Sequence, residues 1–110
     1  MEGLVKGDVI VIEFPFSNLI QAKRRPSLVI KVPKGEDVIV CQITGKSYEK
    51  SVEIPIKEGD FYKGNLKVES YMRLDKIFSV EKSLVKYKAG SLKQEKFDEI
   101  LNKICFYLKS

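Results

Sequence analysis

The stretch PSLVIKVPKGEDVIVCQIT, residues 26–44, decides the fold, because it contains two apolar segments separated by a turn. Residues 26–32 and 38–44 are rich in valine and isoleucine, which are typical of strands. The intervening residues 33–37 include proline, glycine and aspartate, which favour a hairpin turn. DVIVIEF, residues 8–14, is a further strand of the same type. Together they predict an antiparallel β meander, in which Pro26 is expected only at the start of its strand or on a sheet edge.

The remaining segments are longer connections and further strands. Between the expected strands 8–14 and 26–32, residues 15–25 lack periodicity and are expected to form a loop. Residues 45–64 are mostly connection, with a short edge strand at 51–56 and a turn around GDFYKG. One or two strands are expected within residues 65–80, and a last strand at 83–89. The total is about five to seven strands.

Residues 91–109 change to a helical period. Ser91 and Gln94 have the spacing of a capping box, which predicts that the helix begins there. The apolar positions that follow the 3,4 spacing of one helical face are Phe97, Ile100, Leu101, Ile104, Cys105 and Leu108. The predicted fold class is therefore mainly β with a C-terminal helix, and the sheet is expected to curl into a barrel that protects its edges.

Composition narrows the class of protein. The 110 residues are expected to form one domain, 1–110, and the N-terminus lacks the shape of a signal peptide. No apolar run approaches the ~20 residues of a membrane span, so a cytoplasmic protein without membrane contact is expected.

The sequence has no histidine and two cysteines, Cys41 and Cys105, which argues against a zinc site and against histidine-based catalysis. Both thiols are expected in or near the core. The formal charge of +5 suits a nucleic-acid or acidic protein partner.

Three polar motifs could carry chemistry. The run Lys23, Arg24 and Arg25 precedes Pro26, and an arginine held at a strand start is suited to binding a phosphate. Thr44 ends its strand before a glycine and could donate to a phosphate oxygen. Residues 73 and 75, an arginine and an aspartate, share one face of a strand and present a base and an acid together. The alternatives are a solvated basic loop, an ordinary strand-end threonine and a surface ion pair.

The order of these motifs resembles the MazF/PemK family of toxins from prokaryotic toxin–antitoxin pairs. The resemblance is carried by GDVIVIEFPF, KRRPSLVI, VCQITGK and SYMRLDKIFSV, and it extends over almost the whole chain. It implies an SH3-like β barrel of the MazF/PemK/CcdB type that acts as a homodimer. It also implies a metal-independent endoribonuclease without cofactors, which cuts single-stranded RNA at short sequences and is neutralised by an antitoxin.

The resemblance also assigns residues. It implies that Arg25 is catalytic and that Thr44 assists it, and some members also use the residues matching Arg73 and Asp75. Many relatives have a histidine or glutamate in the loop before the Arg-Pro motif, but SNLIQAKRRP has neither, so no role for that loop is carried over. The residues expected to contact RNA are Lys23, Arg24, Phe16, Lys46 and Tyr71, and exposed bases could also stack on Phe14 or Tyr48.

RNA supplies its own nucleophile, the 2′-hydroxyl beside the scissile phosphate. In the expected reaction Arg25 stabilises the phosphorane and Asp75 is the base, provided that partial burial raises its pKa. The products would be a 2′,3′-cyclic phosphate and a 5′-hydroxyl. Two alternatives are a barrel that binds nucleic acid without cutting it and a gyrase poison of the CcdB type. The second relies on a C-terminal tryptophan, and this sequence has none.

Overall fold

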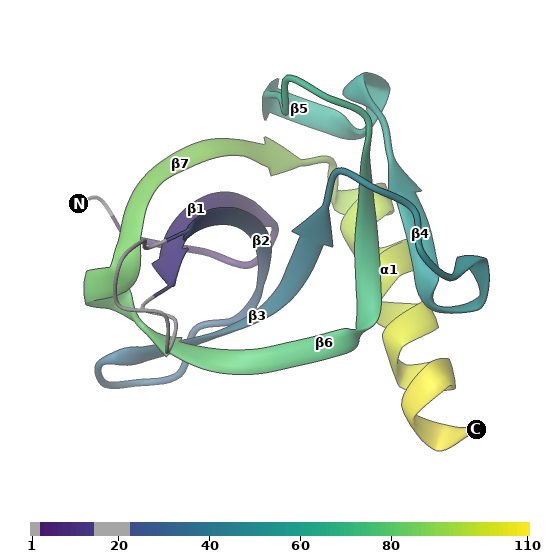
Figure 1. Ribbon diagram of the computed structural model, residues 1–110. Helices are drawn as coiled ribbons and strands as arrows, with labels where there is room; N and C mark the ends of the chain where they lie inside the picture. The colour runs from purple at the N-terminus through teal and green to yellow at the C-terminus, as the bar shows by residue number, and fades with distance from the viewer. Residues whose placement is uncertain (1–2, 15–22) are drawn as a thin grey trace.

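The computed structural model describes residues 3–14 and 23–110, and its β-strands form one curled antiparallel sheet. The strands are β1 (Asp8–Phe14), β2 (Lys23–Lys31), β3 (Asp37–Thr44), β4 (Glu53–Ile56), β5 (Phe61–Gly64), β6 (Ser70–Glu81) and β7 (Val85–Leu92). Their order in the sheet is β4-β6-β3-β2-β1-β7-β5. Figure 1 shows that the central strands curl round into a barrel, while β4 and β5 stand at the two edges of the sheet. The predicted class, mainly β with a C-terminal helix, is confirmed.

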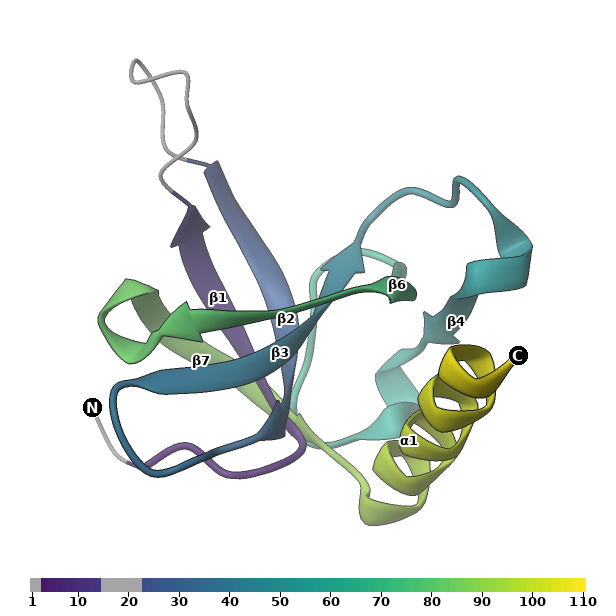
Figure 2. The ribbon, with the colours of Figure 1, turned by 90° about the horizontal axis from the view of Figure 1, so that it is seen from below.

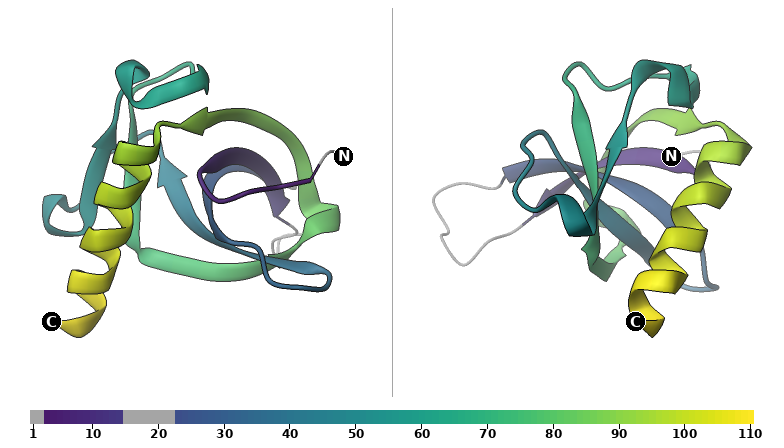
Figure 3. Two further views of the ribbon diagram at one scale, coloured as in Figure 1. Left: turned by 180° about the vertical axis from the view of Figure 1, so that it is seen from behind. Right: turned by 90° about the vertical axis from the view of Figure 1, so that its right-hand side faces the viewer.

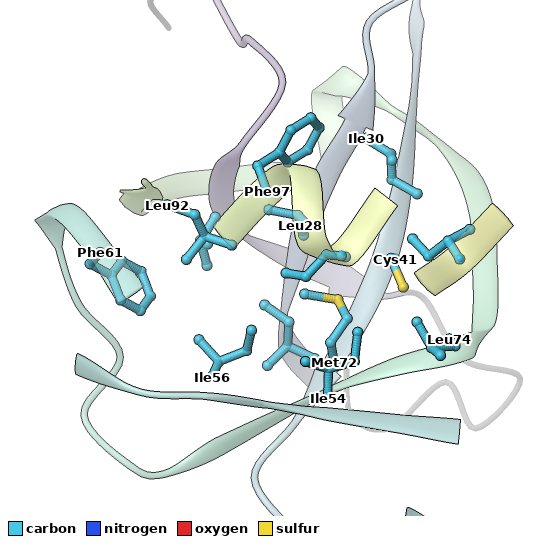
Figure 4. Packing of buried hydrophobic residues seen from close by; sticks show 14 residues of the cluster. Leu28, Ile30, Cys41, Ile54, Ile56, Phe61, Met72, Leu74, Leu92 and Phe97 are labelled. Carbon is cyan, nitrogen blue, oxygen red and sulfur yellow. The ribbon is translucent and has the colours of Figure 1, made fainter. Parts of the chain in front are cut away.

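Two apolar clusters lie on opposite faces of the central strands. In β1, Ile10 and Ile12 belong to a cluster with Val29, Val38 and Val40. Val9, next to Ile10 and pointing the other way, belongs to the larger cluster that α1 (Gln94–Lys109) covers. Figure 4 shows this larger cluster, with side chains from strands and helix meeting. Because both faces of β1 are covered, its run of β-branched residues is buried without alternation.

The strand prediction is wrong at Pro26. β2 begins at Lys23 rather than at Pro26, so the basic triplet lies inside the strand and not in a loop. Pro26 pairs with Val11 of β1, whereas the pairing of β2 with β3 begins at Ser27. Pro26 therefore lies in a central strand, but β3 does not pair with it. Proline has no backbone N–H to donate, and this position tolerates it as a sheet edge would.

The segment GDFYKG, expected as a turn, contains the strand β5 after one turn of 3-10 helix at Glu58–Asp60. Phe61 is buried and pairs with Leu92 of β7, and Gly64 pairs with Gly90. At Gly64 the backbone has φ +70, and an added Cβ would meet the backbone of Ala89 and Gly90. These two glycines therefore allow β5 and β7 to approach closely. Of the one or two strands expected within residues 65–80, the structure has one, β6, which is 12 residues long and has an irregular centre.

The helix begins at Gln94, and the predicted capping box is wrong. The residue that caps it is Lys93, which makes no side-chain capping bond, and the Ser91 hydroxyl donates instead to Asp8 Oδ1 at 2.9 Å. Phe97, Ile100 and Ile104 are buried as expected. No helix within the described ranges is long and apolar enough to cross a membrane.

The C-terminal half of the predicted apolar face is exposed. Cys105 is exposed and Leu108 is 65% exposed, so the expectation that both belong to the covered face is wrong. Figures 1, 2 and 3 show the reason, because the last turns of α1 run away from the strands. Cys41, by contrast, is fully buried in the cluster beneath α1, as expected.

Candidate active site

A cleft with a volume of about 270 Å³ opens where β2 begins and β3 ends. We call it the cationic cleft, and its lining residues are Arg25, Gln42, Thr44, Tyr48, Arg73 and Lys76. They come from β2, β3, the segment after β3, and the centre of β6. Three of the four predicted catalytic side chains, from separate parts of the sequence, thus line one cleft. Two arginines and a lysine give it a positive charge.

Strand alternation separates the two arginines of the basic triplet. Arg25 pairs with Ile12 of β1 and lines the cationic cleft. Arg24 pairs with Glu13 and makes a 3.5 Å ion pair with its carboxylate, which also binds Lys86 Nζ at 3.1 Å. The hydrogen bond from Lys86 is the main reason why the pKa of Glu13 is lowered. Arg24 is therefore engaged outside the cleft.

A bulge in β6 brings two cations to the same cleft. Cys41 of β3 pairs with Ile77, and Ile43 pairs with Met72, so Gln42 alone faces the β6 residues 73–76. In a regular strand, Arg73 and Lys76 would point to opposite faces because they are three residues apart. The bulge lets both line the cleft. The Cys41 thiol donates to the Arg73 carbonyl at 2.9 Å and supports the bulge from the core side.

Burial raises the pKa of the Cys41 thiol to about 12, with a smaller contribution from the charge of Asp75. Cys41 is therefore a neutral hydrogen-bond donor at neutral pH rather than a nucleophile.

Arg73 and Asp75 form a bidentate pair. Arg73 Nε donates to Asp75 Oδ1 at 2.9 Å, and Nη2 donates to Oδ2 at 2.8 Å. The hydrogen bond from Arg73 lowers the pKa of Asp75, and the same bond raises the pKa of Arg73. The expectation that burial raises the pKa of Asp75 is therefore wrong, because the arginine outweighs desolvation. With both oxygens held by Arg73, Asp75 orients the guanidinium.

The segment after β3 places an aromatic ring against Arg73. The ring centroid of Tyr48 lies 5.8 Å from the Arg73 guanidinium carbon, within range of a cation–π interaction. Glu53 fixes this segment by accepting from the Ser47 hydroxyl at 2.7 Å, from Tyr48 N at 2.7 Å and from Glu49 N at 3.0 Å. The bond from Ser47 is the first cause of the lowered pKa of Glu53. Arg73 is thus held by a carboxylate and an aromatic ring.

Thr44 ends β3 as predicted and is largely buried. Its Oγ1 accepts from Lys46 N at 3.3 Å, so the hydroxyl shapes the turn as well as lining the cleft. Lys46 is exposed and is not among the described lining residues. Tyr71 lines a neighbouring cleft instead. Phe16 and the side chain of Lys23 lie outside the described residues.

Two lining residues, Gln42 and Lys76, were not predicted. Gln42 precedes Thr44 by two positions, and the i,i+2 rule of a strand is a signal that could have found it. Lys76 has no such signal, because its place depends on the bulge in β6.

The fold and the cleft together describe a small curled β barrel with a cleft lined by cationic side chains. The chain belongs to the PemK-like, MazF-like toxins of type II toxin–antitoxin systems, whose family model matches residues 5–108. The search of curated proteins gives no match.

Solved structures support the same fold. A mycobacterial endoribonuclease in complex with its cognate antitoxin superposes with a TM-score of 0.76 at 14% identity, covering 97% of this chain and 96% of that one. MazF in a MazE–MazF complex from Deinococcus radiodurans gives 0.75 at 18% identity, with 94% of each chain covered. The toxin MazF-mt6 of Mycobacterium tuberculosis gives 0.67 at 17% identity, with 88% and 90% covered.

Proposed function

We propose that this chain is a sequence-specific, metal-independent endoribonuclease that cleaves single-stranded mRNA in the cytoplasm and thereby inhibits growth. The observation that carries the proposal is the convergence of Arg25, Thr44 and Arg73 in the cationic cleft. Membership of the toxin family and the similarity to proteins described as endoribonucleases support it. The single domain 1–110 would suffice for this activity.

The proposed reaction is attack by the 2′-hydroxyl on the adjacent phosphorus. The O2′–P bond forms and the P–O5′ bond breaks, which leaves a 2′,3′-cyclic phosphate and a 5′-hydroxyl. The proton lost by O2′ is balanced by the proton gained by O5′. Arg25 and Arg73 would neutralise the charge of the phosphorane, and Thr44 would add a neutral hydrogen bond. Asp75 acts here as a positioning residue, because both of its oxygens bind Arg73.

The donor set also favours a reaction without metal. The cationic side chains that line the cleft would repel a divalent cation, and the nearby carboxylate of Asp75 is committed to Arg73. The cleft therefore uses fixed guanidinium groups where a metallonuclease would use metal ions.

The proposed partners are a second copy of the chain and an acidic antitoxin. Unpaired edges at β4 and β5, and the exposed Phe106 and Leu108 at the end of α1, favour burial by dimerisation. In the proposed homodimer the RNA groove lies at the dimer interface. The charge of +5 favours an acidic segment that blocks the groove, and the relatives solved with antitoxins support this.

End mapping tests the activity. The purified chain is incubated with a long unstructured RNA in excess EDTA, and both new ends are identified. We expect cleavage at a short recurrent sequence with cyclic phosphate and 5′-hydroxyl ends. Loss of cleavage in EDTA, or 5′-phosphate products, would contradict the chemistry. RNA that is bound but never cut would favour a non-catalytic binding barrel instead.

Light scattering tests the assembly. We expect a dimer at micromolar concentration and loss of RNA cleavage when the product of an adjacent small acidic reading frame is added. A monomer under these conditions would overturn the proposed homodimer.

A further inference from the structure

Ser27 of β2 pairs with Gln42 of β3, which lines the cationic cleft. We infer that Gln42 is a further substrate-binding residue, whose side-chain amide donates to a non-bridging oxygen of the scissile phosphate. Ser27 is its positioning residue, which holds the other end of that amide. This inference rests on the proposed function.

The Ser27 hydroxyl is buried where the cationic cleft meets an apolar cluster. On β2, Ser27 lies two positions after Arg25, which lines the cleft, and two before Val29, which belongs to the cluster. Residues two apart on a strand share a face, so Ser27 stands between the two. Its neighbour on β1 is Ile10 of the same cluster.

This hydroxyl is an exception among buried polar groups. Ser27 is 0% exposed, and within the described residues it is the one buried side chain whose polar atom has no hydrogen-bond partner. A buried hydroxyl without a partner destabilises a folded chain. A function is therefore the expected reason for a serine here rather than an alanine.

The carboxamide of Gln42 can supply the partner. Directly opposite residues of an antiparallel pair have Cβ atoms about 4.5–5.5 Å apart and point to the same face. A glutamine side chain is long enough to cross this distance by rotating about its own bonds. Gln42 is half-buried and makes no side-chain hydrogen bond with the described residues, so its amide is available for such a bond.

The ligand decides which end of the amide faces the cleft. A phosphate oxygen only accepts hydrogen bonds, so Gln42 must present Nε2 to it. This leaves Oε1 for the wall, where the Ser27 hydroxyl can donate to it. Because Ser27 is fully covered, it cannot contact the substrate itself and acts only through Gln42. The same bond holds the amide against a flip that would turn Oε1 toward the phosphate.

The position of Gln42 places its amide among the other donors of the cleft. Thr44 follows Gln42 by two positions on β3, so their side chains share a face and line the same cleft. Gln42 also faces the bulge of β6 that brings Arg73 and Lys76 to the cleft. A hydrogen bond to a non-bridging oxygen strengthens as charge develops on the phosphorane, so the amide should act on kcat more than on KM.

NMR of the side-chain amide tests the contact without requiring cleavage. The ¹⁵N-labelled chain is titrated with a short single-stranded DNA, which lacks the 2′-hydroxyl and stays intact. We expect the Gln42 Nε2 protons to shift downfield on binding. In Ser27→Ala we expect a smaller shift and binding about threefold weaker, because the amide is no longer held. A Gln42 amide that does not respond to the DNA would overturn the contact.

A double-mutant cycle tests whether Ser27 acts through Gln42. Gln42→Met keeps the length of the side chain and removes the donor, so we expect kcat on a short RNA to fall about tenfold. Ser27→Ala should lower kcat about fivefold in the wild type but have no effect in Gln42→Met. Gln94→Met, the same change at the start of α1, is the control and should leave kcat unchanged. Equal effects of Ser27→Ala in both backgrounds would overturn the positioning role.

Thermal unfolding separates this role from a structural one. Ser70 is a second buried serine, but its hydroxyl donates to the Val68 carbonyl at 2.9 Å. Ser70→Ala should lower the Tm and keep kcat, whereas Ser27→Ala should keep or raise the Tm and lower kcat. A lower Tm with unchanged kcat in Ser27→Ala would mean that this hydroxyl only supports the fold.

The same measurements distinguish this inference from the proposed function. A chain whose Gln42 amide responds to DNA as expected but that never cuts RNA contradicts the proposed function alone. A chain that cuts RNA with unchanged kcat after Gln42→Met contradicts the role of Gln42 alone. We expect the amide to respond to DNA and Gln42→Met to cut RNA slowly.

Discussion

The cationic cleft and a second basic cleft at the other end of β1 differ in how their charges are held. The second, which we call the lysine cleft, is larger, at about 480 Å³. Its charged lining residues are Lys6, Asp8, Lys63, Lys88 and Lys93. By volume and by number of cations the lysine cleft is the more prominent of the two. Its arrangement nevertheless indicates a structural role.

The centre of the lysine cleft is a buried carboxylate. Asp8 is 1% exposed and accepts from Val5 N at 2.9 Å and from the Ser91 hydroxyl at 2.9 Å, while Lys88 Nζ lies 3.2 Å away. These bonds tie the start of β1 to the end of β7. In the cationic cleft, by contrast, Arg73 is fixed by Asp75 and Tyr48 and still lines the open space. The comparison teaches that the proposed phosphate site is distinguished from the lysine cleft by fixed forked donors, and not by its volume or net charge.

Replacing Arg25 should give the largest effect. We expect Arg25→Ala to lower kcat about 10²–10³-fold, because a pre-organised donor to the phosphorane is lost. Lys63→Ala, which removes one charge from the lysine cleft, is the control and should leave kcat unchanged. Single-turnover cleavage of a short RNA measures both, with folding checked by circular dichroism. Equal losses in the two variants would mean that overall charge, and not the cleft, drives turnover.

Asp8→Ala should give the largest effect on stability. The variant leaves Ser91, Lys88 and an amide without their buried acceptor, so we expect the free energy of unfolding to fall by about 2–3 kcal/mol. The chain that remains folded should keep kcat, because Asp8 lies outside the cationic cleft. Urea unfolding and cleavage by the same sample provide the two measurements. A fall in kcat with unchanged stability would assign Asp8 to the chemistry instead.

Asp75→Asn should have an intermediate effect. We expect kcat to fall about tenfold, because a looser Arg73 is still a cation, whereas loss of a general base would cost about 10²–10⁴-fold. The lowered pKa of Asp75 means that its pairing stabilises the fold fully above the ordinary aspartate pKa of about 3.9. This stabilisation is lost as pH falls through the lowered value.

The stability difference between wild type and Asp75→Asn should stay below about 1 kcal/mol at pH 7, since both side chains contact solvent. It should disappear in strong acid. Urea titrations at pH 7 and pH 2 measure it, and a difference that grows toward low pH would contradict the pairing.

The double variant Lys63→Ala with Lys93→Ala should give the smallest effect. We expect less than a twofold change in kcat or KM on a short RNA. The same result is expected for Lys31→Ala with Lys34→Ala, which removes an equal charge from β2 and the following turn. A tenfold rise in KM confined to the first pair would make the lysine cleft a second RNA site.

Local sequence patterns were sufficient for the elements that depend on neighbours in the chain. The strands β1 and β3 follow from their β-branched residues, and the first turns of α1 follow from the spacing of Phe97, Ile100 and Ile104. The separation of Arg24 from Arg25 follows from strand alternation once β2 extends back over the basic triplet, which was predicted as a loop. Arg25, Thr44 and Arg73 were predicted as site residues, and the structure brings them to one cleft.

Other features depend on contacts between distant segments, which no local pattern encodes. The bulge opposite Gln42 arises where β3 meets β6, and it alone brings Lys76 to the cleft. The pKa of Asp75 is lowered because side-chain geometry gives both of its oxygens to Arg73. Ser91 bonds to Asp8, 83 residues away in the chain, instead of capping α1. The sequence alone therefore determined most of the strands, the helix and the candidate cations, whereas tertiary packing decided which charges are fixed and face one cleft.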